Sequence, residues 1–250
     1  MNHLKEFRKG IESLAGRYHI WQVFEDWTEA AAIELHQATY VMVSGRKNTE
    51  VEKQYMDIIS RYDPEDVRKV FPTLFLHVVE GLQEEPCDFL GQAFMELDLG
   101  SHWHGQFFTP YHLSKMMAQM TLQEIPDKEV ITISEPACGS GGLLVACAEV
   151  LRDREIDPTF RMHAVATDVD STCFNMAYIQ LSLMGISAEV CLGNTLSCEV
   201  RRYWRTFASV LTGHTISSLR RLAEVKPTEM SVKSRAELSY VNDALGVVQG

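Results

Sequence analysis

A glycine-rich loop, Ser-Glu-Pro-Ala-Cys-Gly-Ser-Gly-Gly at residues 134–142, has the residue types best suited to bind a ligand. Its glycines let the backbone turn sharply and come close to a ligand that a Cβ would keep away. The next segment, Leu143 to Leu151, predicts a helix whose N-terminus presents free N–H groups and a partial positive charge. Because the carboxylate of Glu135 repels a phosphate and attracts an amine, the loop favours a ligand with a positive amino group.

Two further polar residues end the next two predicted strands. Asp168 stands where a carboxylate can accept both hydroxyls of a ribose, with Asp170 as a competitor for that role. Asn194 carries an amide that both donates and accepts, as the edge of an adenine requires, although an ordinary turn residue is an equal alternative. An amine, a ribose and an adenine together describe S-adenosylmethionine, which is therefore the predicted cofactor.

These residues need a β-α-β framework to hold them. Residues 130–133, 162–167 and 188–192 predict three short strands, with helices at 143–151 and 171–184 between them. This alternation is typical of a parallel sheet with right-handed crossovers. The expected fold is α/β with a Rossmann-like cofactor domain.

The flanking regions are expected to be helical. We predict an N-terminal helical region at 1–100, a Rossmann-like core at 101–200 and a mostly helical, basic segment at 201–250. Thr109 and Pro110 are expected at the N-cap and first position of a helix. Besides the two helices of the β-α-β framework, the predicted helices are Trp21–Tyr40, Thr49–Tyr62, Val67–Leu82 with a kink or break at Pro72, Pro110–Leu122, Glu199–Leu211 and Thr215–Val225.

Composition narrows the class of protein. The 250 residues are 46% hydrophobic, yet no apolar run is long enough to cross a membrane and no signal core follows the N-terminus, so we expect a cytoplasmic protein without membrane contact. The six cysteines form no Cys-x-x-Cys pair, which predicts reduced thiols. His102 and His104 lack a third ligand at a recognisable spacing, so no metal is predicted.

The net charge of −11 is unevenly distributed. Residues 197–250 carry 8 Lys and Arg against 5 Asp and Glu, whereas the rest of the chain is acidic. An acidic body does not attract phosphates, so direct contact with DNA would fall to the basic segment, unless that segment is simply a solvated helix face. The arginines expected there are Arg201, Arg202, Arg205, Arg220 and Arg221.

Three segments together resemble the N6-adenine DNA methyltransferases, in particular the modification subunits of type I restriction systems. Gly-Gln-Phe-Phe-Thr-Pro at 105–110 is similar to that family's Gly-x-Phe/Tyr-x-Thr-Pro element. Glu-Pro-Ala-Cys-Gly-Ser-Gly-Gly at 135–142 is similar to its Asp-Pro-Ala-Cys-Gly-Ser-Gly-Gly loop, with Glu for Asp. Leu-Gly-Asn-Thr-Leu at 192–196 resembles its Gly-Asp/Asn-Thr/Ser-Leu element. The resemblance spans roughly residues 88–200.

The resemblance implies a Rossmann-like methyltransferase domain that binds S-adenosylmethionine. It places Phe108 and Thr109 at the methionine end of the cofactor. The full set of predicted cofactor-binding residues is Phe108, Thr109, Glu135, Pro136, Ala137, Gly139, Ser140, Gly141, Asp168 and Asn194.

The family's catalytic element, Asp/Asn-Pro-Pro-Tyr/Phe, has no counterpart in this chain. In that element an amide or carboxylate accepts hydrogen bonds from the amine of a flipped adenine, and the aromatic ring stacks on the base. This sequence contains no Pro-Pro, and after Asp168 its only proline is Pro227. The catalytic residues are therefore not predicted, and we expect an incomplete sheet.

Several functions remain open on this basis. The chain is a DNA adenine methyltransferase with a divergent acceptor site, a subunit whose acceptor site lies on a partner chain, or a catalytically silent cofactor-binding relative with a regulatory, partner-binding or anti-restriction role. DNA and a protein partner both remain candidates for binding. The acidic N-terminal region could mimic the charge of DNA, although an ordinary acidic surface is the simpler interpretation. Tyr203, Trp204 and Phe207 could stack on a base, although a place in the core is simpler.

Overall fold

The computed structural model describes residues 1–99, 107–125 and 130–215. Helices dominate the N-terminal part, and strands begin only after residue 130. The helices are α1 (His3–Leu14), α2 (Ile20–Ser44), α3 (Thr49–Ile59), α4 (Pro64–Glu84), α5 (Phe89–Glu96), α7 (Tyr111–Thr121), α8 (Gly142–Arg152), α9 (Pro158–Arg161), α10 (Ser171–Leu183) and α11 (Phe207–Thr212). The strands are β1 (Ile131–Glu135), β2 (Met162–Asp168), β3 (Ala188–Asn194) and β4 (Glu199–Arg205).

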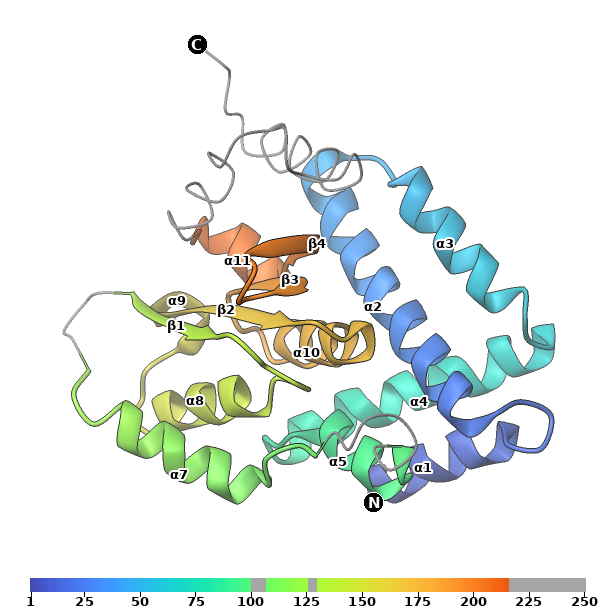
Figure 1. Cartoon of the computed structure of the whole chain (residues 1–250), viewed down its shortest axis with the longest axis horizontal. Coiled ribbons are helices and arrows are strands. Elements are labelled where there is room, and N and C mark those ends of the chain that lie inside the picture. The colour runs from blue at the N-terminus through green and yellow to red at the C-terminus, as the bar shows by residue number, and fades with distance from the viewer. Residues whose placement is uncertain (100–106, 126–129, 216–250) are drawn as a thin grey trace, which may run out of the picture.

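Within the described residues, the sheet has four strands in the order β1-β2-β3-β4. β1 pairs with β2 and β2 with β3 in parallel, while β4 runs antiparallel to β3. The long helices α8 and α10 connect the parallel strands and lie together on one side of the sheet (Figure 1). The parallel β-α-β arrangement confirms the expected α/β fold. In the described part of the chain β1 has β2 as its only neighbour, so β1 forms one edge of the sheet.

The N-terminal helices are joined to the sheet layer by one hydrophobic core. α2 packs along α10, and α1 crosses α4 at the far end of the molecule (Figure 1). Trp27 of α2 is 1% exposed and its Nε1 donates to the carbonyl of Phe71 in α4 at 3.1 Å. Pro64 occupies the first turn of α4, after the cap residue Asp63. Of the kink or break expected at Pro72, the break is wrong, because α4 continues through this proline to Glu84.

The segment after β3 differs from the sequence-based expectation. A helix was predicted over Glu199–Leu211, but residues 199–205 form β4 and only Phe207–Thr212 is helical. The reason is tertiary: in β4 Trp204 pairs with Val190 of β3 and is 4% exposed. Its indole stacks on the imidazole of His36, with ring centroids 4.3 Å apart. Burial of this large ring outweighs the weak helical preference of the segment.

The remaining expected elements are confirmed within a few residues, with one local correction. Thr109 does not cap α7: the N-cap is Pro110, without a side-chain hydrogen bond. No described helix is both long and apolar enough to cross a membrane. The expected helix at Thr215–Val225 falls, from residue 216 on, outside the described residues, as do His102, His104, Gly105 and Gln106.

Candidate functional site

The glycine-rich loop connects the carboxyl end of β1 to the N-terminus of α8 and contacts the carboxyl end of β2. The N–H of Cys138 donates to the carbonyl of Thr167 at 2.9 Å, which fixes the loop to the end of β2. Gly139 and Gly141 have φ angles of +54° and +89°, the left-handed region that glycine enters without strain. Gly141 is the N-cap of α8, so the first N–H groups of that helix open toward the loop.

Close contacts explain why the loop needs glycine. A Cβ on Gly139 would lie 2.9 Å from Cδ1 of Phe108. A Cβ on Gly141 would lie 3.3 Å from the backbone of Ala177 in α10. The ring of Phe108 therefore rests directly on the loop, and it also packs against Phe94 with centroids 5.2 Å apart.

Asp168, at the end of β2, holds the loop from the side. Its Oδ2 accepts a hydrogen bond from the N–H of Gly139 at 2.9 Å, and its Oδ1 accepts from the N–H of Asp170 at 3.0 Å. Each carboxylate oxygen retains a lone pair for a ribose hydroxyl. The competitor Asp170 is instead the N-cap of α10, where its Oδ1 accepts from the N–H groups of Thr172 and Cys173.

Glu135, at the end of β1, is a half-buried acid in a negative surrounding. Burial raises the pKa of this carboxyl, and the neighbouring charge of Asp168 raises it further, against a hydrogen bond from the N–H of Ala137. A cation would relieve both effects, because it compensates lost hydration and offsets the repulsion. The site is therefore electrostatically suited to a positive amino group.

Asn194 and Thr195 bring the third strand end to the same place. The hydroxyl of Thr195 donates to the carbonyl of Pro136 at 2.7 Å, which ties the loop after β3 to the glycine-rich loop. The Oδ1 of Asn194 accepts from the N–H groups of Leu196 and Ser197, so it serves its own turn. Its Nδ2 is the group left for the edge of a base.

Asp88 is not among the residues predicted from the sequence, yet its buried side chain accepts a hydrogen bond from the glycine-rich loop and supports it. This residue is 3% exposed and caps α5 by accepting from the N–H of Gly91 at 3.0 Å. Its Oδ2 accepts from the hydroxyl of Ser140 at 2.6 Å, and its Oδ1 accepts from Nε2 of Gln180 at 2.9 Å. Burial raises the pKa of Asp88, while these three donors lower it.

Gln180 of α10 completes this network. Its Nε2 also donates to the carbonyl of Ser140 at 2.7 Å, and its Oε1 accepts from the N–H of Leu90 at 3.0 Å. The side chain of Ser140 therefore faces the core, and only its backbone N–H remains for a ligand. The network joins α5, the loop and α10 into one support.

The predicted residues other than Ser140 are arranged around the loop in different ways. Phe108, Glu135, Gly139 and Asp168 lie together around the loop, and Asn194 joins them through the neighbouring Thr195. Pro136, Ala137 and Gly141 contribute backbone, and Thr109 is exposed beside them. The Cys138 thiol has a raised pKa through burial and the nearby carboxylates, so it is an unsuitable nucleophile.

Two of the arginines proposed as DNA contacts are held by the fold. Arg205 is 9% exposed and donates to the side chain and carbonyl of Ser209. Arg202 lies over the ring of Trp204 at 5.1 Å and pairs with Glu29 at 3.5 Å. Trp204 belongs to the core, so it is not a base-stacking surface. Arg201 remains exposed, and residues 220 and 221 lie outside the described ranges.

Comparison with known proteins matches residues 97–219 to the family model of the N-6 DNA methylases. One solved structure with a similar arrangement is a Listeria monocytogenes protein classed as a class I S-adenosylmethionine-dependent methyltransferase: 18% identity, 74% of this chain, 51% of that chain and a TM-score of 0.36. Another is the methyltransferase subunit of a type I restriction-modification system from Streptococcus thermophilus: 12% identity, 74% of this chain, 55% of that chain and a TM-score of 0.40. The chain spans about half the length of both.

Proposed function

We propose that the chain binds S-adenosylmethionine at the glycine-rich loop and takes part in methylation of adenine in DNA, because residues 97–219 match the family model of the N-6 DNA methylases. The observation that carries the proposal is the loop itself, in which the left-handed Gly139 is hydrogen-bonded to Asp168 and Glu135 stands at the opposite end. One acidic side chain, Glu135 or Asp168, would therefore lie at each end of an elongated cofactor bound along the loop.

The residues fit the cofactor in chemical terms. Glu135 would hold the methionine amino group, whose positive charge would offset the burial and the repulsion by Asp168 that raise the pKa of this carboxyl. Asp168 would accept the ribose hydroxyls, and Nδ2 of Asn194 would donate to the adenine edge. Phe108, which covers Gly139, would exclude water at the methionine end. When bound, S-adenosylmethionine supplies an electrophilic methyl group, and the described residues bind and orient it.

The candidate functions differ in where the residues that bind the target adenine would lie. In the described part of the chain, β1 is an edge strand, so its outer side is available to a further strand. A partner chain that pairs there would place its own residues beside the cofactor loop. The second candidate is a catalytically silent relative that binds the cofactor and has a regulatory or anti-restriction role.

Expression in a methylation-deficient bacterial host tests the proposal. If the chain is active alone, N6-methyladenine should appear in the DNA of the host, and Asp168→Ala should abolish it. If activity requires a partner, the modified base should appear only on co-expression with the partner that co-purifies. Cofactor binding by calorimetry without modified DNA under either condition would favour the silent relative. Failure to bind the cofactor at all would refute the proposal.

The affinity for S-adenosylmethionine should fall as the medium becomes acidic. The cofactor's ammonium group favours the ionised form of Glu135, so binding lowers the raised pKa of this carboxyl. Affinity is therefore greatest above the pKa of the free protein and is lost as the pH falls through it. Calorimetric titration between about pH 4.5 and 7.5 measures this slope.

The matched variant Glu135→Gln keeps the size of the side chain and removes its titration. It should bind more weakly at neutral pH, by about tenfold, with little change toward acid. An unchanged pH slope in this variant would place the titrating group elsewhere.

A further inference from the structure

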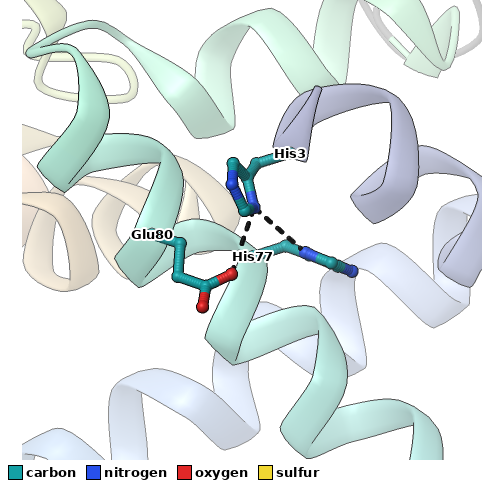
Figure 2. Close-up of side chains that lie close together, drawn as sticks. All are labelled: His3, His77 and Glu80. Atoms are coloured by element: carbon teal, nitrogen blue, oxygen red, sulfur yellow. Dashed lines mark hydrogen bonds and ion pairs between the residues drawn. The ribbon is translucent and has the colours of Figure 1, made fainter. Parts of the chain in front are cut away.

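A second cluster of polar side chains lies away from the sheet, where the start of α1 packs on α4. His3, His77 and Glu80 point toward one another there (Figure 2). Nδ1 of His3 lies 3.3 Å from Nδ1 of His77 and 3.3 Å from Oε2 of Glu80. One potential ligand atom from each residue lies within 4.8 Å of the other two.

The packing of the two helices fixes this geometry. His77 and Glu80 are three residues apart on α4 and so share a face. His3 is the first residue of α1, whose N-cap Asn2 accepts from the N–H of Lys5 at 2.9 Å. Gly81 lies beside His3 on α4, where a Cβ would reach the Cβ of His3 at 3.4 Å, an ordinary van der Waals distance. As a result His3 is 7% exposed although it lies near the chain terminus.

A fourth residue sets the tautomer of His3. Nε2 of His3 lies 3.1 Å from Oε1 of Glu84, so it donates its hydrogen to that carboxylate. Nδ1 of a neutral His3 then presents a lone pair, and it faces the carboxylate of Glu80. His77 can supply one proton at most between these groups. A metal ion or a further proton would offset the repulsion between these acceptors, and a carboxylate behind a histidine is common at metal sites.

We propose that His3, His77 and Glu80 bind a divalent transition-metal ion of the zinc class. Adjacent ligand atoms of a tetrahedral zinc site with bonds of about 2.0–2.1 Å lie about 3.3 Å apart, which is the spacing around Nδ1 of His3. Two imidazoles and one carboxylate suit zinc or cobalt, whereas calcium and magnesium prefer oxygen ligands. The side chain of Glu80 is 43% exposed, so water can enter and complete the coordination.

The site would cross-link α1 to α4, which are far apart in the sequence. No metal was expected from the sequence, because residues 3, 77 and 80 match no familiar ligand spacing. The ion would therefore stabilise the helical region rather than act in the cofactor site.

Metal titration of the full chain after treatment with a chelator tests the inference. Calorimetry with Zn²⁺ and the visible absorption of bound Co²⁺ should show one equivalent bound, and Zn²⁺ should raise the melting temperature. His77→Ala and the conservative Glu80→Gln should each weaken binding at least about tenfold and remove the thermal shift. Affinity should also fall in acid, because protons compete for the two imidazoles.

His112→Ala is the matched control, because it removes an exposed histidine on α7. This variant should bind metal like the wild type. The proposal is overturned if the wild type binds no metal. A proton shared between these three side chains would then account for their close approach. It is also overturned if His112→Ala loses binding equally, or if thiolate-to-cobalt absorption assigns the ion to a cysteine such as the exposed Cys198.

Discussion

Replacing Gly139 with valine is expected to abolish binding of S-adenosylmethionine, with a loss of affinity of about 100-fold or more. Two effects combine at this position. The φ angle of +54° disfavours any side chain, and a β-branched one most. The new Cβ would also lie 2.9 Å from the ring of Phe108, so either the ring or the loop must move. Calorimetry of the purified variant measures the loss.

Gly45→Val separates loss of the site from general strain. Gly45 also has a left-handed φ, of +70°, but a Cβ there would meet nothing within 4 Å. This variant should pay a similar backbone cost, about 1–2 kcal/mol of folding free energy, and bind the cofactor normally. Wild-type affinity in Gly139→Val would show that the cofactor binds elsewhere. Weakened binding in Gly45→Val would show that instability alone explains the effect.

The local part of the site could be predicted because its signals are local. Glycines after a short apolar strand require a tight turn into a helix, and an acid at the next strand end follows from the same β-α-β repeat. The structure places Glu135, Gly139 and Asp168 accordingly. Nothing beyond neighbouring residues was needed to infer their proximity, since parallel strands end at one edge of the sheet.

β4 could not be predicted in this way, because its conformation depends on distant partners. Val200, Arg202 and Trp204 alternate as in a strand, but two arginines obscure the apolar pattern. Arg202 satisfies its charge through Glu29 and the ring of Trp204, which the sequence does not place nearby. The sequence likewise does not show that two of the arginines predicted to contact DNA are held by partners within the fold.

Asp88 was missed for the same reason. Before an apolar helix it looks like an ordinary N-cap, and it does cap α5. Its other two partners, Ser140 and Gln180, lie 52 and 92 residues further along the chain. Only the folded chain shows that this cap also holds the cofactor loop.

Asp88→Ala is expected to lower the free energy of unfolding by about 2–4 kcal/mol. The substitution leaves the hydroxyl of Ser140 without its acceptor in the core and removes the cap of α5. Because Ser140 belongs to the glycine-rich loop, we also expect affinity for S-adenosylmethionine to fall by about tenfold. Urea denaturation followed by circular dichroism, and calorimetry on the folded protein, measure the two effects.

Asp63→Ala is the matched control, because Asp63 caps α4 at an exposed position, where it accepts from the N–H of Glu65 at 2.8 Å. It should cost about 1 kcal/mol of stability and leave cofactor binding unchanged. Asp88→Asn keeps one oxygen for Gly91 and Gln180 and should fall between wild type and Asp88→Ala in both measurements. If Asp88→Ala loses stability but binds the cofactor as tightly as wild type, Asp88 supports the helices alone. Its bond to Ser140 would then have no part in shaping the loop.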